Sequence, residues 1–259
     1  PDMARLKTPN TPDLEVLLAP PTPMMLAVEQ AVLRGRKWSL AAAPVAERIA
    51  VRIAGAITLD LIHAGQRLLE NDLGEALHVS RAPVREALRI LERERMVEFQ
   101  ARRGAVVTAP DANDLHDIYV VRDALYQLLL QELMERQLKE LQAAFRLYMP
   151  RIAKAAEAGS VDDYTVETFL LNLAMTELSS NQLIVDLLTS IALRTARYVR
   201  LGLVADPERL RSSLRTWRAL QRAIDRGDIA EVLATAHKRI ESSRDSAVTV
   251  ASWSSRSCR

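Results

Sequence analysis

DLGEALHVSRAPVREALRIL, residues 72–91, is the stretch that decides how the N-terminal part of this chain folds. Apolar residues repeat at helical spacing on both sides of a short break at His78-Val79. Ser80 suits the N-cap of the second segment, and Pro83 falls in its first turn, where a missing N–H costs little. Two helices joined across so short a bend must cross steeply, which predicts a helix-turn-helix.

The second of these helices carries three arginines on one face. Arg81, Arg85 and Arg89 are spaced one helical turn apart, so their guanidinium groups align while apolar residues occupy the other face. A recognition helix needs this division, because one face packs on its own domain and the other offers forked donors to phosphates and guanine edges. The alternative is a solvated amphipathic helix whose arginines pair with Glu86 and Glu92.

A basic hairpin is predicted directly after the two helices. Residues 97–100 and 105–108 have the composition of strands, and Ala101-Arg102-Arg103-Gly104 forms the turn between them. Gly104 is free to take a positive φ there. A hairpin with arginines at its tip, following a helix-turn-helix, is a wing that reaches the minor groove or its flanking phosphates.

This segment resembles the GntR family of bacterial transcription regulators. The resemblance rests on Gly65 to Leu68, Asp72-Leu73, Val79-Ser80-Arg81, Pro83 to Leu88, Leu91, Arg103-Gly104-Ala105 and Val107. The chain departs from the family at His78 and Arg95, where glycine is common, and at Asn71, where a basic or polar contact residue is usual. The helix face, the wing and the resemblance together make these residues the candidates for DNA contact: Asn71, Ser80, Arg81, Ala82, Pro83, Arg85, Arg89, Arg102, Arg103 and Gly104.

Length and composition limit the remaining possibilities. The 259 residues, 49% of them hydrophobic, provide for two domains, and the net charge of +2 argues against a general nucleic-acid coat. One cysteine, Cys258, cannot form an internal bridge, and the sequence contains neither a bilayer-spanning apolar run nor a signal-peptide core. A cytoplasmic protein with no membrane partner is therefore expected.

The predicted fold is mainly α, with a winged helix-turn-helix of three helices and a small β-hairpin joined to an antiparallel helical bundle. Residues 1–42 are expected to form a flexible arm, although Met24 to Lys37 have the spacing of a short helix. The winged domain is placed at 43–110, with its first helix over 44–63, and a disordered tail at 251–259. The all-α domain is placed at 111–250, with helices near 112–137, 137–158, 160–179, 181–204, 207–226 and 228–248.

The second domain resembles the ligand-binding domain of the FadR-type branch of GntR regulators, an FCD-like domain that binds an effector and dimerises. Members of that branch commonly hold a divalent metal with one Asp and three His side chains. The resemblance puts Thr168, Asn172 and Trp217 at ligand positions, with Arg239 or, after a small shift, His237 at the last. This set does not make a metal site, so no metal cofactor is expected.

A cavity between helices, with a few polar anchors, is expected in place of the metal. Arg122 is the main candidate for a buried cation that pairs with an acidic effector. The alternatives are a structural ion pair with Asp123 or Glu167, or a contact at the domain junction. The expected effector is a lipophilic acid, such as a fatty acid or an acyl thioester. The full set of effector-binding candidates is Tyr119, Arg122, Thr168, Asn172, Arg194, Tyr198 and Trp217.

The function predicted from these patterns is a ligand-responsive repressor that binds a palindromic operator as a homodimer. An effector that fits one arrangement of the bundle would shift the balance between DNA-competent and incompetent states. The alternative is an architectural or constitutive DNA-binding dimer with no effector. An enzyme is not expected, because no nucleophile-base set, phosphate-binding glycine loop or carboxylate pair can be assembled from the sequence.

Overall fold

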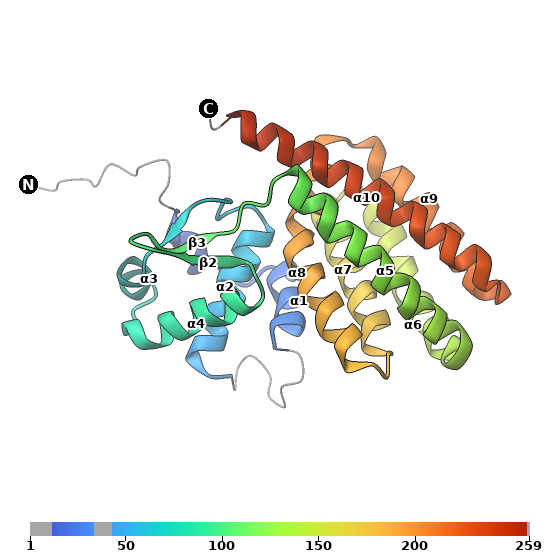
Figure 1. Ribbon diagram of the computed structural model, residues 1–259, viewed down its shortest axis with the longest axis horizontal. Coiled ribbons are helices and arrows are strands. Elements are labelled where there is room, and N and C mark those ends of the chain that lie inside the picture. Colours follow the sequence, from blue (N-terminus) through green and yellow to red (C-terminus); the bar gives the residue numbers. More distant parts are fainter. Residues whose placement is uncertain (1–11, 34–42, 258–259) are drawn as a thin grey trace, which may run out of the picture. The chain divides into compact units, whose positions relative to one another are not determined.

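The computed structural model describes residues 12–33 and 43–257, and the chain divides into two compact units between Ala109 and Pro110 (Figure 1). The fold is mainly α, with a small sheet in the first unit and a helical second unit, as the sequence predicted. Within the described residues, no helix is long and apolar enough to cross a membrane. Residues 1–11 and 34–42 of the expected arm, and Cys258, lie outside the described residues.

The first unit contains a winged helix-turn-helix. Its three-stranded antiparallel sheet has the order β1-β3-β2, with Phe99 of β2 opposite Ala105 of β3. The elements are α2 (Val45–Thr58), β1 (Arg67–Leu68), α3 (Glu70–Ala76), α4 (Arg81–Arg93), β2 (Val97–Gln100) and β3 (Gly104–Val107). The sequence predicted the hairpin but not β1, because a two-residue strand is too short to show alternation and exists only through its pairing with β3.

The core of this unit forms where α4 packs against α2. Val84, Leu88 and Leu91 of α4 and Ile53 of α2 have no exposed surface. Their spacing places the apolar residues of α4 along one stripe, and the burial of that stripe fixes the opposite face of the helix toward solvent. The hydrophobic contact therefore determines where the arginines of α4 point.

The N-terminal segment is folded where the sequence analysis expected a flexible arm. A 3-10 turn (η1, Leu14–Leu17) and α1 (Pro23–Val32) pack against α2, and Leu17 and Val28 are fully buried. Arg52 of α2 donates to the carbonyl oxygens of Leu17 and Ala19 at 2.6 and 2.9 Å. The expectation of a flexible arm was wrong for residues 12–33, whereas the short helix indicated by the spacing after Met24 is present as α1. Burial against α2 stabilises both η1 and α1.

Gly55 is the point of closest approach between α1 and α2. A Cβ atom added to Gly55 would lie 2.3 Å from Cγ and 3.1 Å from Cα of Met25. The contact therefore requires a residue without a side chain, because part of the obstruction is the backbone of α1.

Replacing Gly55 with Ala should destabilise the protein by about 1–3 kcal/mol, because α1 must shift to admit the methyl group. In a helix without this contact, replacing Gly with Ala would stabilise the folded protein by roughly 0.5–1 kcal/mol. The sign of the change in unfolding free energy therefore shows whether α1 packs against Gly55. Urea denaturation gives the free energy of unfolding, and hydrogen exchange should show weaker protection of residues 23–32. A more stable G55A variant would mean that α1 does not pack here.

The second unit is a six-helix bundle. Its helices are α5 (Ala112–Arg136), α6 (Leu138–Glu157), α7 (Val161–Glu177), α8 (Gln182–Ala205), α9 (Glu208–Arg226) and α10 (Ile229–Ser257), and α10 lies along α5 (Figure 1). Asp111 caps α5 in a capping box with Asp114, directly after Pro110. Asn181 caps α8, and Gly227, with φ of 70°, ends α9.

Helix α10 extends further than the sequence indicated. It continues to Ser257, although residues 251–259 were expected to form a disordered tail. Val250 and Ala251 are 8% and 4% exposed, and Ala251 belongs to the buried core of the bundle. Tertiary packing therefore supports a segment that is too polar to be predicted as a core helix.

Candidate functional site

Arg81, Arg85 and Arg89, three of the four arginines of α4, are exposed on the face opposite its buried stripe. Arg81 lies in the first turn, and Arg85 and Arg89 follow one and two turns later. Within the described residues Arg81 forms no hydrogen bond or ion pair, so its guanidinium is available to a partner. The first unit therefore offers three forked donors on one solvent-facing helix.

Two of these arginines have protein partners. Arg85 donates from Nε and Nη2 to the two carboxylate oxygens of Glu70, at 2.9 and 2.8 Å. This hydrogen-bonded pair lowers the pKa of Glu70 and raises the pKa of Arg85. Arg89 pairs with Glu92 at 2.8 Å and lies over the ring of Phe99. Pairing with Glu92 was part of the alternative interpretation, whereas the carboxylate that holds Arg85 comes from α3.

The turn between α3 and α4 brings several of the predicted contact residues together. Asn71 lines the same shallow hollow as Ser80 and Arg81, at the N-terminus of α4. Ala82 is exposed and Pro83 is half-buried in the first turn. The free N–H groups at this end of the helix add donors for an anion next to the arginine.

The wing presents its arginines to solvent. Residues 101–104 are all exposed, and Arg103 contacts the side-chain oxygen of Gln100 at 3.3 Å. Gly104 takes a φ of 73°, and Arg102 takes a φ of 62° beside it. His78 and Arg95, where glycine is common in the resembling family, also have positive φ, at 53° and 55°. The backbone at both positions is left-handed, which explains why glycine is favoured there.

The Glu70–Arg85 pair gives a testable prediction. Replacing Glu70 with Gln should free the Arg85 guanidinium for a phosphate, tighten binding to random-sequence DNA, and steepen the dependence of log affinity on log salt by about 1. Fluorescence anisotropy across a salt series measures both quantities. Glu86→Gln is the matched control, because it removes the same charge from exposed α4 without releasing Arg85. Equal effects of the two changes would show that charge alone matters.

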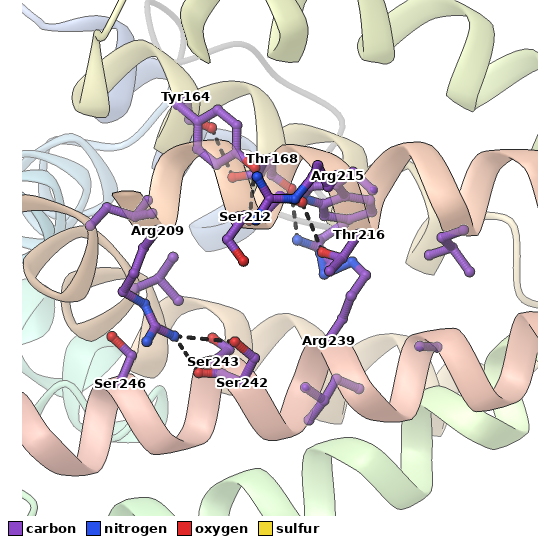
Figure 2. Close-up of a pocket in the computed structure, with 18 of the residues that line it drawn as sticks. Tyr164, Thr168, Arg209, Ser212, Arg215, Thr216, Arg239, Ser242, Ser243 and Ser246 are labelled. Carbon is purple, nitrogen blue, oxygen red and sulfur yellow. Dashed lines mark hydrogen bonds between the residues drawn. The ribbon is translucent and has the colours of Figure 1, made fainter. Parts of the chain in front are cut away.

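The second unit contains a cavity of about 350 Å³ between α9 and α10, with α5, α7 and α8 also contributing to its wall. Figure 2 shows Ser212, Arg215 and Thr216 across the cavity from Arg239, Ser242, Ser243 and Ser246. The volume falls within the roughly 300–1,000 Å³ that is common for small-molecule sites. The wall combines arginines, hydroxyl groups and a few aliphatic side chains.

Arg239 is the most unusual group in this wall. Its guanidinium lies 3.4 Å from the ring centroid of Trp217, and its Nε is buried without a hydrogen-bond partner. Desolvation by burial lowers the pKa of Arg239 to about 10, so the group still carries its charge at neutral pH. Arg122, also in the wall, donates to Thr195 Oγ1 at 3.1 Å and lies between the rings of Tyr119 and Tyr126.

Hydrogen bonds hold the polar wall in place. Tyr126 donates to the side-chain oxygen of Asn172, whose amide nitrogen donates to the Thr168 carbonyl at 2.7 Å. Tyr164 donates to Ser213 at 2.8 Å, and the hydroxyl of Tyr119 contacts that of Ser243 at 3.1 Å. Such a fixed wall presents a defined set of polar groups to whatever occupies the cavity.

The structure brings together some of the predicted effector-binding residues. Arg122, Thr168, Asn172 and Trp217 line the cavity, and Tyr119 supports it through Ser243. Arg194 and Tyr198 do not line it, and Tyr198 is part of the buried core of the bundle. The expected alternative for Arg122 is not formed, because Asp123 pairs with His237 at 2.6 Å and Arg122 contacts Thr195.

Sequence reasoning missed most of the α9 and α10 side of the cavity. Arg239 was considered only as a misplaced metal ligand, while Arg209, Arg215 and the lining serines were not considered. The signal was weak but present, since Ser212-Ser213 on α9 and Ser242-Ser243 with Ser246 on α10 form polar clusters within helices. Serine is a weak helix former, so helix stability does not explain why serines repeat on one face of these helices.

Two family profiles match the chain, one in each unit. "Bacterial regulatory proteins, gntR family" matches residues 45–107, and the FCD domain matches residues 117–242. The chain belongs to the GntR family of bacterial regulatory proteins. The FCD match, the family type that the FadR-type resemblance implied, begins within α5 and ends within α10.

Several known proteins are similar to this GntR-family chain. The uncharacterized HTH-type transcriptional regulator YdhC of Bacillus subtilis is 31% identical over 98 residues, which are 38% of this chain and 44% of that protein. The gluconate operon transcriptional repressor of Bacillus licheniformis is 28% identical over 141 residues, 54% of this chain and 57% of that protein. The matched segments thus span about half the length of these relatives.

A solved structure supports the fold over a larger part of the chain. A putative GntR transcriptional regulator from Rhodococcus sp. RHA1 aligns with a TM-score of 0.65 over 79% of this chain and 97% of its own, at 21% identity. At this level of identity the likeness concerns the fold. The order of a winged helix-turn-helix and a helical bundle is therefore shared with that protein.

The divalent metal of the FadR-type branch does not fit the residues of this FCD domain. Thr168 donates to backbone carbonyls of α7, the Asn172 oxygen accepts from Tyr126, and Trp217 has no lone pair to offer. At the last position the guanidinium of Arg239 would repel a cation, and His237 pairs with Asp123 on an exposed face. No group of three or more potential ligands among the His, Cys, Asp and Glu side chains occurs in the described part of the chain.

Proposed function

We propose that this GntR-family protein is a ligand-responsive transcription regulator, acting as a repressor. In this proposal a homodimer binds a palindromic operator through the winged domains, and a small effector in the FCD cavity changes the affinity for DNA. The observation that carries the proposal is the combination, in one chain, of an arginine-bearing helix with a basic wing and a separate cavity lined by arginines, of which Arg239 has a buried Nε.

The DNA-binding half of the proposal rests on donor geometry. Arg81 and Arg85 lie at the N-terminal end of α4, where a recognition helix meets base edges in the major groove. Arg102 at the tip of the wing lies outside that helix and suits a phosphate or minor-groove contact. Asn71 and Ser80 lie at the start of α4 and would fix its register on the duplex.

The repressor and dimer assignments have separate support. A similar protein, the gluconate operon transcriptional repressor of Bacillus licheniformis, is a repressor by name. A dimer is the simplest way for one winged domain per chain to read two half-sites. Val121 and Leu128 of α5 and Leu183 and Leu187 of α8 are between 42% and 65% exposed on two helices that contact each other, so apolar surface is available for association.

The effector half of the proposal rests on the cavity. A protein whose two conformations bind a ligand unequally must change its DNA affinity when that ligand binds, provided the two conformations also differ in DNA binding. A lipophilic acid, such as a fatty acid or acyl thioester, was the class expected from the sequence. The carboxylate of such a molecule matches the arginines of the cavity wall, and its acyl chain can contact only the apolar part of that wall, which includes Val199, Leu203 and Leu220.

Single substitutions on α4 and the wing test the DNA-binding surface. Arg81→Ala and Arg85→Ala should each cost about 1–3 kcal/mol of binding to a site selected from a random library, and both should blur base preference. Arg102→Ala should instead weaken binding evenly across sequences and reduce the salt slope by about 1. Fluorescence anisotropy on selected and scrambled duplexes measures both effects.

Arg93→Ala is the matched control for these variants, because Arg93 is an exposed arginine at the far end of the same helix. It should leave affinity and selectivity close to those of the parent. If the Arg85 variant bound the selected site as tightly and selectively as the parent, α4 would not be the recognition helix. If no ligand altered DNA affinity, the architectural alternative, a constitutive DNA-binding dimer, would be the better description.

A further inference from the structure

We propose that the FCD cavity binds a hydroxylated carboxylate without a metal, and that the guanidinium of Arg239, with Arg122, grips the carboxylate where relatives of the FadR type use a divalent cation. The claim that this ligand is the effector rests on the function proposed above. The claim that the cavity binds it rests on the cavity alone.

The first argument is the balance of charge around the cavity. Arg122 and Arg239 both line it, and neither has a carboxylate partner among the described residues. The two acidic lining residues are exposed and already engaged, since Glu208 pairs with Arg211 at 3.1 Å and Asp206 accepts from the Glu208 backbone N–H. A buried cation without a counter-ion is costly, so the cavity favours an anion that supplies one.

The second argument is the position of Arg239. Its flat guanidinium is stacked on the Trp217 ring, which fixes its plane, and the buried Nε–H has no protein acceptor. A guanidinium held in one plane with unsatisfied donors is matched by a carboxylate, whose two oxygens accept two parallel hydrogen bonds. Trp217 and Arg239 occupy two positions that the resemblance assigns to metal ligands. The Arg239 guanidinium therefore takes the place of the divalent metal ion.

The third argument is the number of hydroxyl groups facing the same space. Ser212, Ser213, Ser242, Ser243 and Ser246 line the cavity together with Thr216 (Figure 2). Ser213, Ser242, Ser243 and Thr216 are already hydrogen-bonded within the bundle. Ser212 and Ser246 form no hydrogen bond among the described residues, so a ligand that covered them with methylene carbons would leave their hydroxyl groups unsatisfied. A ligand with several hydroxyl groups satisfies them. The wall on α9 and α10 therefore favours an acid that carries hydroxyl groups over the purely lipophilic acid expected from the sequence.

Thermal-shift measurements on the full chain test the ligand class. Gluconate, the acid in the name of a similar repressor, is the probe, and sorbitol is its uncharged counterpart with the same carbon chain. We expect gluconate to raise the melting temperature in proportion to the logarithm of its concentration, also in EDTA, and sorbitol and decanoate to have no effect. A shift with decanoate alone, an equal shift with inorganic phosphate, or loss of the gluconate shift in EDTA would overturn the proposal.

Variants of α10 test the role of Arg239. Arg239→Met should weaken gluconate binding at least about tenfold by calorimetry, and Arg239→Lys should restore part of it. Lys238→Met is the matched control, because it removes the same charge from the adjacent exposed position outside the cavity. Gluconate binding by Arg239→Met that equals the parent would overturn the proposal.

Two readouts keep the two proposals separate. The circular dichroism spectrum should be unchanged in Arg239→Met without ligand, which shows that the variant is folded. If the parent binds DNA but no hydroxylated acid, the inference about the cavity fails and the regulator proposal stands. If it binds gluconate but no DNA, the regulator proposal fails and the ligand site stands.

Discussion

Burial of the apolar stripe of α4 against α2 is the constraint on which the first unit depends. Val84, Leu88 and Leu91 can leave water only if the opposite face of the same helix stays in it, and that face carries Arg81 and Arg85. The hydrophobic contact thus orients the charged groups without any direct interaction with them. The three-stranded sheet continues from the end of α4 and carries the basic wing on its outer loop.

In the second unit the groups that matter for binding line an internal cavity, whereas in the first unit they lie on the exposed face of α4. Two guanidinium groups line the cavity: that of Arg239, with a buried Nε, lies on the Trp217 ring, and that of the half-buried Arg122 lies over the rings of Tyr119 and Tyr126. Aromatic faces compensate a cation only in part, and the charge is fully balanced when an anion joins them. A pocket with this arrangement favours an anionic ligand. Its hydroxyl groups favour, among anions, those that can form further hydrogen bonds.

The departures from expectation share one physical cause. The segment over residues 12–33 was expected to be a flexible arm, with only the spacing of a short helix after Met24, yet η1 and α1 are both ordered by packing against α2. Strand β1 exists only because β3 offers it partners. Arg239 was weighed as a metal ligand because counting along the chain could place it at that position, whereas only the packed helices bring it onto Trp217. Each of these features depends on contacts between residues far apart in the sequence.

The sequence by itself determined the helix-turn-helix, the wing, the helical bundle and the family, because periodicity, caps and turn residues act over a few neighbouring positions. It also identified Arg122, Thr168, Asn172 and Trp217, which the bundle gathers around one cavity. Only the tertiary structure decided that Arg85 is held by Glu70, that α1 is part of the winged unit, and that the cavity wall is rich in serine and arginine. These are long-range contacts, and their geometry is set by packing that no local pattern encodes.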